Sequence, residues 1–294
     1  MNLTRKVSVV IPTLGGFCLE ETIRQLNNGS HVPDEILICI PEEDSHKVEE
    51  FSFQNVKVIK TPFRGQVAQR AFGFGRVNNE LVLQLDDDIL LNENCLEKLI
   101  NFILDNPGSA VGPKLIERAT GKYHSYLYKD RNEITLIDKF SFFILNGELG
   151  CQAGQLSKAG LFMGIPEKPD NWLGVGWLPG GCVLHRKNNL VLDNYYPVKG
   201  KAYWEDLFHS DILRNKGIMM HRVGEAVCTV DFSGNQQLNI IFFINEFWKV
   251  SNIIWIYIKK NKISSSRIFL FHFCNTLILI FRKLIKLIKI NSSY

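Results

Sequence analysis

The sequence predicts an α/β fold in which a mostly parallel sheet is flanked by helices. Short aliphatic and β-branched runs alternate with stretches of helical spacing, and this alternation is typical of parallel sheets covered on both faces. The 294 residues, of which 46% are hydrophobic, can form one large core with an appendage. In such a sheet, ligands bind beyond the carboxyl ends of the strands, so the segments that follow the strands are the first candidates for a site.

The first half of the chain contains the clearest elements. Four strands are predicted, at Val7–Ile11, Glu35–Ile40, Val56–Lys60 and Leu81–Leu85. Between the first two strands, Leu19, Ile23 and Leu26 recur at helical spacing, and this helix is expected to end near Gly29. A second helix is predicted from about Glu93 to Leu104, where apolar residues repeat on one face.

The second half is less regular. From Glu117 to Leu178 the sequence is rich in glycine and aromatic residues, and this long segment indicates an insertion shaped around a partner or substrate. Regular elements are predicted again after it: a strand at Cys182–His185, a helix at Glu205–Lys216, and strands at Ile218–Val223 and Ala226–Val230.

The C-terminal region is basic and amphipathic. The net charge of the chain is only +4, and its basic excess lies at Lys259, Lys260, Lys262, Arg267, Arg282, Lys283, Lys286 and Lys289. On a helical wheel, apolar residues from Leu277 to Ile288 share one face and the last four of these cations share the other, which is typical of a helix lying in a membrane interface. The upstream apolar run Ile268–Phe281 is shorter than the roughly 20 residues that span a bilayer. We therefore favour a helix lying on the membrane over a spanning one; a helix docked on the core is the other alternative.

Composition also indicates a compartment. The seven cysteines are scattered and form no Cys-x-x-Cys pair, so neither a disulfide framework nor a zinc site is indicated. Only MNLTRK precedes the first strand, which is too short for a secretory signal. We expect a cytoplasmic protein, peripheral on the inner face of the cell membrane, with no nucleic-acid partner.

Three consecutive acids, Asp86, Asp87 and Asp88, follow the buried strand at Leu81–Leu85. Unpaired buried negative charge is costly, so acids at the end of a buried strand indicate a cation, most naturally a divalent metal that also binds phosphate. A solvated turn or a calcium loop is the alternative, although Ile89–Leu91 adds none of the further oxygen ligands that calcium requires.

The other strand ends are also suited to a ligand. The first strand leads into Pro12-Thr13-Leu14-Gly15-Gly16, where glycine allows close backbone approach, and the second leads into Pro41-Glu42-Glu43-Asp44. Acid-rich loops accept hydrogen bonds from hydroxyl groups and base N–H groups, and a metal would let them hold a diphosphate that bare carboxylates repel.

Three blocks, in their order and spacing, resemble family 2 glycosyltransferases of the GT-A, Rossmann-like fold. RGQVAQRAFGFGRVNNELVLQLDDD resembles that family's Gly-rich turn, Arg-bearing helix and Asp-x-Asp strand, with matches at Arg64, Gly65, Arg70, Glu80, Asp86 and Asp88. LPGGCVLHRK resembles the acceptor-side Gly-Gly strand, and WEDLFHSDILRNKG resembles the Glu-Asp helix. The resemblance implies a catalytic domain at 1–235, with a nucleotide-binding half (1–116) and an acceptor-binding half (117–235), before a C-terminal helical membrane-associating region at 236–294.

The resemblance implies an inverting, metal-dependent glycosyltransferase of hexosyltransferase type. A sugar would move from a nucleotide-sugar donor, with a UDP-sugar favoured, to a hydroxyl of a glycan or lipid-linked acceptor in bacterial surface polysaccharide synthesis. Mn2+ or Mg2+ is the implied cofactor, with Asp88 as its principal ligand, and Asp86 would share the metal or contact the ribose. Asp206 would be the general base and Glu205 would bind acceptor hydroxyls, or the two roles would be exchanged.

The resemblance implies further nucleotide-sugar contacts at Pro12, Thr13, Glu42, Glu43, Asp44, Gly65, Arg70, Asp87, Gly180 and Gly181. Ile40 and Pro41 occupy the place where the family often has a base-reading Asp, so Glu42, Glu43 or Asp44 would substitute for it. Asp231 is the candidate for an added metal or diphosphate ligand, or is a turn residue.

Each of these assignments has a simpler alternative. An Asp in the first turn of a helix, such as Asp206, is also a favourable partner of the helix dipole. Arg70 would steady phosphate or the acid loop, or form an exposed helical salt bridge. Gly180 and Gly181 also suit a tight turn before a strand. At the level of the whole chain, the alternatives are a sugar-phosphate nucleotidyltransferase, which should carry an Arg in the loop after the first strand, and a non-catalytic membrane-bound nucleotide or glycan binder.

Overall fold

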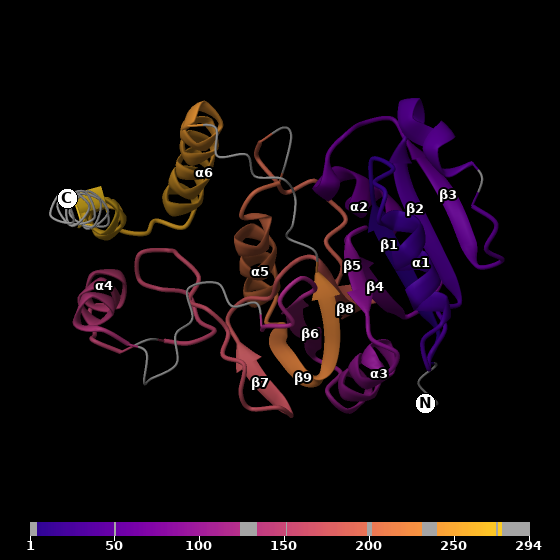
Figure 1. The fold of residues 1–294 in the computed structure, drawn as a ribbon, viewed down its shortest axis with the longest axis horizontal. Coiled ribbons are helices and arrows are strands. Elements are labelled where there is room, and N and C mark those ends of the chain that lie inside the picture. Colours follow the sequence, from indigo (N-terminus) through magenta and orange to yellow (C-terminus); the bar gives the residue numbers. More distant parts are fainter. Residues whose placement is uncertain are drawn as a thin grey trace, which may run out of the picture.

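The computed structural model describes residues 5–49, 51–123, 134–150, 152–198, 202–230, 240–274 and 276–277, with the backbone alone for 240–247. Within this part of the chain, one sheet of nine strands has the order β3-β2-β1-β4-β8-β6-β9-β5, and β7 also pairs with β9 (Figure 1). The strands are β1 Val7–Pro12, β2 Glu35–Pro41, β3 Val56–Thr61, β4 Leu81–Leu85, β5 Ile89–Leu91, β6 Ser109–Glu117, β7 Trp172–Val175, β8 Cys182–Arg186 and β9 Met219–Val230.

Most of these strands run in one direction. β1 to β4 are parallel to one another, and β6 and β9 share their direction. β5, β7 and β8 run the opposite way, so β8 is antiparallel to both β4 and β6. Every residue of β1, β2 and β4 is buried, which explains why these strands are continuous apolar runs. The predicted α/β fold with a mostly parallel, helix-flanked sheet is confirmed.

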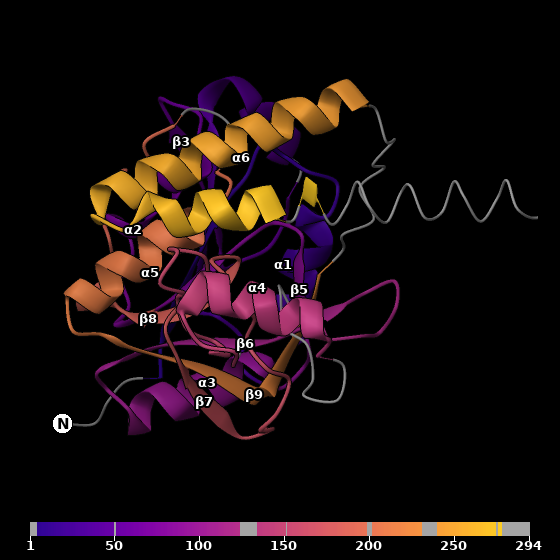
Figure 2. The ribbon, with the colours of Figure 1, turned by 90° about the vertical axis from the view of Figure 1, so that its left-hand side faces the viewer.

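Helices cover both faces of the sheet. They are α1 Leu19–Asn27, α2 Gln66–Phe74, α3 Cys95–Asp105, α4 Leu136–Asn146, α5 Glu205–Asn215 and α6 Ile240–Lys260, with short 3-10 helices at Glu42–Val48 and Lys187–Asn189. Apolar residues of α1 and α3 share one core with alternate residues of β1, such as Val9. The residues of β1 that point to the opposite face of the sheet, such as Val10, pack against Phe74 at the end of α2. α5 packs beside α2 through Leu207 and is covered in turn by Tyr257 of α6 (Figures 1 and 2).

The structure differs from the sequence prediction in the second half of the sheet. The two strands predicted at Ile218–Val223 and Ala226–Val230 are one strand, β9, whose pairing with β6 shifts register between Pro113 and Lys114. The break in the sequence pattern is therefore a bulge inside β9. The apolar residues after the acid triplet form β5, which is antiparallel to β9. The irregular segment from Glu117 to Leu178 contains α4 and β7.

The C-terminal region begins with α6. After it, residues 265–274 and 276–277 form one more helix, named here the C-terminal helix, which lies with α4 at the end of the molecule opposite β3 (Figure 1). Among the described residues, no helix is both long enough and apolar enough to cross a bilayer. The predicted amphipathic tail beyond Leu277 lies outside the described residues.

Candidate active site

The carboxyl ends of β2, β1 and β4 lie side by side, because these strands are parallel neighbours. They lead into the three polar segments that the sequence analysis singled out, at 13–16, 42–44 and 86–88. The buried hydroxyl of Thr13 donates a hydrogen bond to the carboxylate of Asp87. The loop after β1 and the acid turn after β4 are therefore linked directly.

The three acids of the turn have different surroundings. Asp86 is partly buried, and its Oδ1 accepts hydrogen bonds from Gln66 Nε2 at 2.8 Å and from Arg70 Nη2 at 3.1 Å. Asp87 points across to Thr13 rather than back into the sheet. Asp88 is exposed. The turn thus offers two carboxylates held by protein donors, Asp86 and Asp87, and one, Asp88, that is exposed to solvent.

Arg70 joins the acid turn to the beginning of α5. Its side chain is only 2% exposed, and its Nη1 donates to Glu205 Oε1 at 2.6 Å while Nη2 donates to Asp86. Glu205 is also buried and accepts a second hydrogen bond, at Oε2, from the Tyr195 hydroxyl at 2.6 Å. Of the alternatives for Arg70, the exposed helical salt bridge is therefore wrong, and contact with the acid loop is the one observed.

The glycine pair before β8 lets the backbone approach these carboxylates closely. The N–H of Gly180 donates to Asp206 Oδ1 at 2.6 Å. A Cβ at Gly180 would lie 2.5 Å from both Asp206 Oδ1 and Glu205 Oε1, and one at Gly181 would lie 3.2 Å from Asp86 Oδ2. A larger residue at Gly180 would displace the carboxylates, so close approach requires glycine there.

The chain enters α5 through a strained residue. Trp204 has a φ of 61°, in the left-handed region that residues with bulky side chains rarely adopt. Its ring stacks on Phe162 at a centroid distance of 4.6 Å, and Phe162 stacks on Trp177 at 4.3 Å. This aromatic column holds the backbone that presents Glu205 and Asp206, and strain of this kind clusters at functional sites.

The charges of this group are unbalanced. Burial raises the pKa of Asp86 to about 6, against the opposing effect of Arg70. Burial and the charge of Glu205 raise the pKa of Asp206 to about 8. Burial alone would lower the pKa of Arg70, but Glu205 and Asp86 outweigh it and raise the pKa. One guanidinium therefore serves several carboxylates, and the group favours binding of a further proton or cation.

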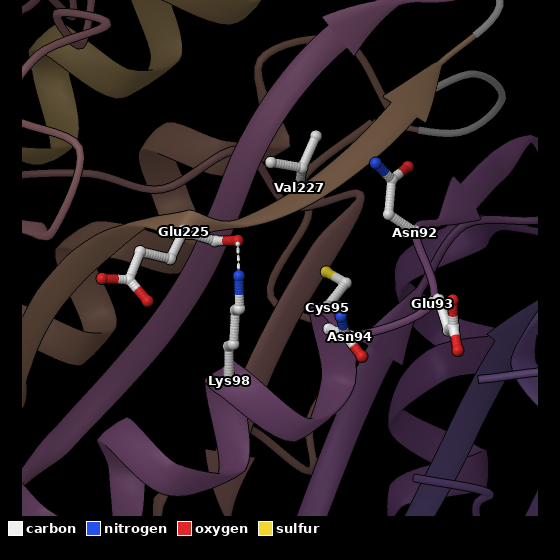
Figure 3. Close-up of a pocket in the computed structure, with 7 residues that line it drawn as sticks. All are labelled: Asn92, Glu93, Asn94, Cys95, Lys98, Glu225 and Val227. Atoms are coloured by element: carbon white, nitrogen blue, oxygen red, sulfur yellow. Dashed lines mark hydrogen bonds between the residues drawn. The ribbon is translucent and has the colours of Figure 1, made fainter. Parts of the chain in front are cut away.

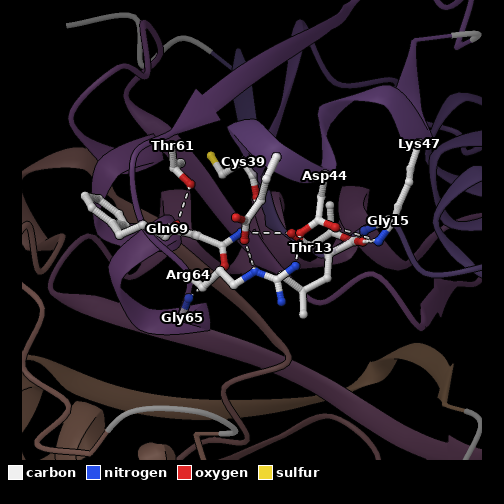
Figure 4. Close-up of polar contacts among 12 residues, drawn as sticks. Thr13, Gly15, Cys39, Asp44, Lys47, Thr61, Arg64, Gly65 and Gln69 are labelled. Atoms are coloured by element: carbon white, nitrogen blue, oxygen red, sulfur yellow. Dashed lines mark hydrogen bonds and ion pairs between the residues drawn. The ribbon is translucent and has the colours of Figure 1, made fainter.

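A second group of charges lies at the carboxyl end of β2. Asp44 is buried between Arg64, which also donates to Glu43, and Lys47, whose Nζ donates to Asp44 Oδ1 at 2.7 Å (Figure 4). Hydrogen bonds from Lys47 and Arg64 lower the pKa of Asp44. Lys47 Nζ also donates to the carbonyl of Leu14 at 3.0 Å, so this group is tied to the loop after β1.

The remaining predicted residues are distributed around these two groups. Pro12 is the buried last residue of β1, and Gly65 precedes α2 with a φ of 135° that favours glycine. Glu42 and Glu43 are exposed, so Asp44 is the only member of that acid run whose side chain is buried. Asp231 lies outside the described residues, immediately after β9.

Several residues of the site were missed by sequence reasoning. Gln66 binds Asp86, and Gln69 Nε2 donates to the carbonyls of Thr13 and Cys39 at 2.8 and 2.7 Å, so α2 ties the ends of β1, β2 and β4 together (Figure 4). Both glutamines lie within the block that resembles the glycosyltransferases, which could have drawn attention to them. No sequence signal indicated Tyr195.

The described residues contain no group of three or more His, Cys, Asp or Glu side chains placed to hold a metal. The acid turn nevertheless fits the pattern of Mg2+ and Mn2+ sites that use one or two carboxylates together with phosphate oxygens of the substrate. Asp88 is exposed, and Asp86 is partly buried and accepts two hydrogen bonds at its Oδ1. The turn therefore has one exposed carboxylate and one fixed by the protein that could contribute to such a site.

A surface pocket of about 390 Å³ lies elsewhere, where β5 leads into α3 (Figure 3). It is lined by Asn92, Glu93, Asn94, Cys95, Lys98, Glu225 and Val227. Lys98 Nζ closes one side by donating to the carbonyl of Glu225 at 3.0 Å. None of these residues belongs to the predicted site, so this pocket is separate from the crevice at the carboxyl ends of β1, β2 and β4.

Comparison with known proteins agrees with this geometry. The family model described as glycosyl transferase family 2 matches residues 8–158, slightly more than half of the chain. The chain belongs to glycosyl transferase family 2. The match ends before Gly180 and α5, so the second half of the site is placed by the structure alone. A search of curated protein sequences gave no significant match.

Among solved structures, this glycosyltransferase is similar to GalNAc-T7, whose crystal structure contains UDP, GalNAc and Mn2+. The two superpose with a TM-score of 0.58 at 14% identity, over 80% of this chain and 44% of that protein. The likeness confirms the GT-A fold, and this glycosyltransferase corresponds to less than half the length of its neighbour. The sequence-based hypothesis of a family 2 glycosyltransferase is confirmed.

Proposed function

We propose that this glycosyltransferase moves a sugar from a nucleotide-sugar donor, most simply a UDP-sugar, to a hydroxyl of a glycan or lipid-linked acceptor, with inversion at the anomeric carbon. The observation that carries the proposal is the junction of the two halves of the chain at Arg70, which binds Asp86 of the acid turn and Glu205 of α5. Residues suited to the donor diphosphate thus lie next to residues suited to the acceptor. UDP and Mn2+ in the structural neighbour support the same choice of donor and metal.

The donor nucleotide would bind over the ends of β1 and β2. Asp44 is the acid best placed to accept a hydrogen bond from the base, with Glu42 and Glu43 at the rim. Thr13 and Asp87 would lie below the ribose, where Thr13 also orders the loop by accepting a hydrogen bond from the Gly15 N–H at 2.9 Å. Arg64 is shared between Glu43 and Asp44, and its hydrogen bond contributes to the lowered pKa of Asp44.

Asp88, with Asp86, would hold Mn2+ or Mg2+ at the diphosphate, and Asp231 is a further candidate ligand. When bound, the ion would neutralise the negative charge that develops on the departing nucleoside diphosphate. Arg70 and Gln66 fix the carboxylate of Asp86 through its Oδ1, so the turn is organised before the ion binds.

Asp206 is the proposed general base. The acceptor hydroxyl gives its proton to Asp206 while its oxygen bonds to the anomeric carbon, and the bond from that carbon to the diphosphate oxygen breaks on the opposite face. Asp206 is suited to this step because it accepts one hydrogen bond from the Gly180 N–H among the described residues, and because a pKa of about 8 favours taking up a proton. Glu205 is already held by Arg70 and Tyr195, so positioning of the acceptor is its proposed role.

The proposed setting is bacterial surface polysaccharide synthesis on the cytoplasmic face of the membrane. The basic C-terminal sequence from Lys259 onward supports a lipid-borne acceptor, because it suits an anionic surface. We retain the division into a nucleotide-binding half at 1–116, an acceptor-binding half at 117–235 and a membrane-associating region at 236–294 as part of this proposal.

The test is UDP release from a panel of UDP-sugars with Mn2+, with and without glycan or lipid-linked acceptors. We expect Asp206→Asn to lower turnover by about 10²–10⁴-fold, because it removes the base. The matched control is Asp211→Asn on the same helix, where the carboxylate pairs with Arg214 at 3.1 Å. Equal turnover in Asp206→Asn and the parent would reject Asp206 as base. Formation of UTP and a sugar 1-phosphate when pyrophosphate is added to the UDP-sugar would favour a nucleotidyltransferase, and tight nucleotide binding without turnover would favour a non-catalytic binder.

A further inference from the structure

Helix α4 presents an apolar stripe to solvent. Leu136 is 83% exposed, and Ile137, Phe140 and Phe143 are each exposed by at least 44%. Their spacing places them on one face of the helix. The opposite face packs inward through Leu145, within a core that includes Ile258 of α6. The inner face of α4 therefore holds the helix on the protein, and the exposed stripe takes no part in that packing.

The C-terminal helix presents a second stripe next to the first. Phe269, Leu270, Phe273 and Leu277 are its exposed large apolar residues. The two stripes meet in an apolar pocket of about 410 Å³ that is lined by Leu136, Ile137, Phe140, Cys274 and Leu277 (Figure 2 shows the two helices side by side). Arg267 fastens the helices together, since its Nη1 donates to the carbonyl of Ile144 at 2.9 Å. One continuous surface results, named here the apolar face.

The sequence around the apolar face is strongly basic. Among the described residues of this region, Lys259, Lys260, Lys262 and Arg267 precede or lie in the C-terminal helix, and residues 259–274 contain no Asp or Glu. Lys139 adds an exposed cation within α4. Of the acids near α4, Asp138 accepts hydrogen bonds from Thr135 at the start of the helix and Glu148 lies 4.0 Å from Lys158. The excess of cations favours an occupant that is both apolar and negatively charged.

We propose that the apolar face docks on an anionic lipid bilayer, with the side chains of α4 and the C-terminal helix inserted at the headgroup boundary. Lys and Arg around an apolar stripe match anionic headgroups above acyl chains. A second copy of the chain would bring like-charged segments together, which disfavours self-association through this face. The inference goes beyond the proposed function, because it makes α4 of the catalytic region a membrane contact. It does not depend on turnover.

The test uses the full chain and vesicles of phosphatidylcholine with or without phosphatidylglycerol. We expect binding to the anionic vesicles, measured by co-sedimentation, to weaken at least about tenfold in the double variant Phe140→Ser/Phe269→Ser. Leu192→Ser is the matched control, because Leu192 is 59% exposed and lies outside the apolar face. Hydrogen exchange should show vesicle-induced protection of residues 136–146 and 265–277 in the parent and the control.

Three results would overturn the inference. The first is equal vesicle binding by the double variant and the parent, and the second is protection confined to residues after Leu277. The third is a lipid-free dimer in sedimentation velocity that the double variant abolishes, which would make the apolar face a contact between two copies. Circular dichroism and thermal unfolding of the double variant, measured without vesicles, show that it is folded and keep this test separate from that of the proposed function.

Discussion

Two groups of carboxylates lie at the same edge of the sheet and have opposite electrostatic properties. In the first, Asp44 is bonded by Lys47 and Arg64, and these hydrogen bonds lower its pKa. In the second, Asp206 is partly buried beside Glu205, and loss of solvent together with that charge raises its pKa to about 8. The residue types are the same, so the difference arises from how far each carboxylate is removed from water and from the cations that the fold places beside it.

This difference separates two tasks. Asp44 already has its cations, so the group at β2 is complete and suits neutral donors such as a nucleoside base. At the acid turn, Arg70 alone serves Asp86 and Glu205, with Asp206 beside them. A group short of positive charge favours whatever supplies it: a proton taken from an acceptor hydroxyl, or a divalent ion that arrives with a diphosphate.

The largest expected effect is a loss of stability when the arginine of a carboxylate group is replaced. Each group has one arginine, Arg70 at the acid turn and Arg64 at the end of β2, so the two losses can be compared. Arg70→Met should destabilise the protein by about 3–5 kcal/mol in urea unfolding, because it leaves two buried carboxylates without their cation. Arg64→Met should cost much less, because the Arg64 side chain is half exposed and Asp44 keeps Lys47 as a second cation. Equal losses for the two variants would contradict the distinction between the groups.

The next effect tests the close approach of backbone and carboxylates. Gly180→Ala places a methyl group 2.5 Å from Asp206 Oδ1 and Glu205 Oε1, so we expect a loss of about 1–3 kcal/mol together with lower turnover. Gly150→Ala is the control, because no atom lies within 4 Å of the Cβ position there. Thermal unfolding and UDP release measure the two effects, and a Gly180→Ala protein that matches the parent in both would show that the carboxylates move aside freely.

The smallest effect is a dependence of stability on pH, measured without metal. Because the pKa of Asp206 is raised in the fold, its ionisation costs stability as pH rises from about 4 toward 8. Asp206→Asn should therefore be more stable than the parent by about 1 kcal/mol or more at pH 8, and the gain should vanish near pH 4.

Asp44→Asn should behave in the opposite way. The folded pKa of Asp44 is lowered, so its charge adds stability above the unfolded pKa, and this contribution is lost as pH falls. The variant should be less stable than the parent at neutral pH and converge with it in acid. Parallel pH profiles for the two Asn variants in chemical unfolding would show that the two groups do not differ.

Sequence alone predicted the parts of the fold that depend on local pattern. β1, β2 and β4 were predicted to within a residue or two because strands buried on both faces are uninterrupted apolar runs. β5 was missed because its three residues continue the run of β4 beyond the acids, and only pairing with β9 makes it a separate strand. α4 was missed because its sequence is apolar on most sides, which hides the helical period.

The site also has a part that the sequence predicted and a part that it did not. Strand ends are set by topology, so the positions of Thr13, Asp86 and the acids after β2 followed from the order of elements. Which acid of Glu42 to Asp44 is buried depends on Arg64 and Lys47, whose reach the sequence does not specify. The bond from Arg70 to Glu205 joins residues 135 positions apart, and no local pattern predicts a contact of that separation.

The most direct test of the account is the Mn2+ dependence of UDP binding, measured by calorimetry on the parent and on Asp88→Ala. The account predicts that Mn2+ strengthens UDP binding to the parent, and that Asp88→Ala, although folded, loses this gain. Asp193→Asn, an exposed carboxylate away from the acid turn, is the control that should keep it. An Asp88→Ala protein whose UDP affinity still rises with Mn2+ as in the parent would contradict the central claim that the acid turn holds the cation.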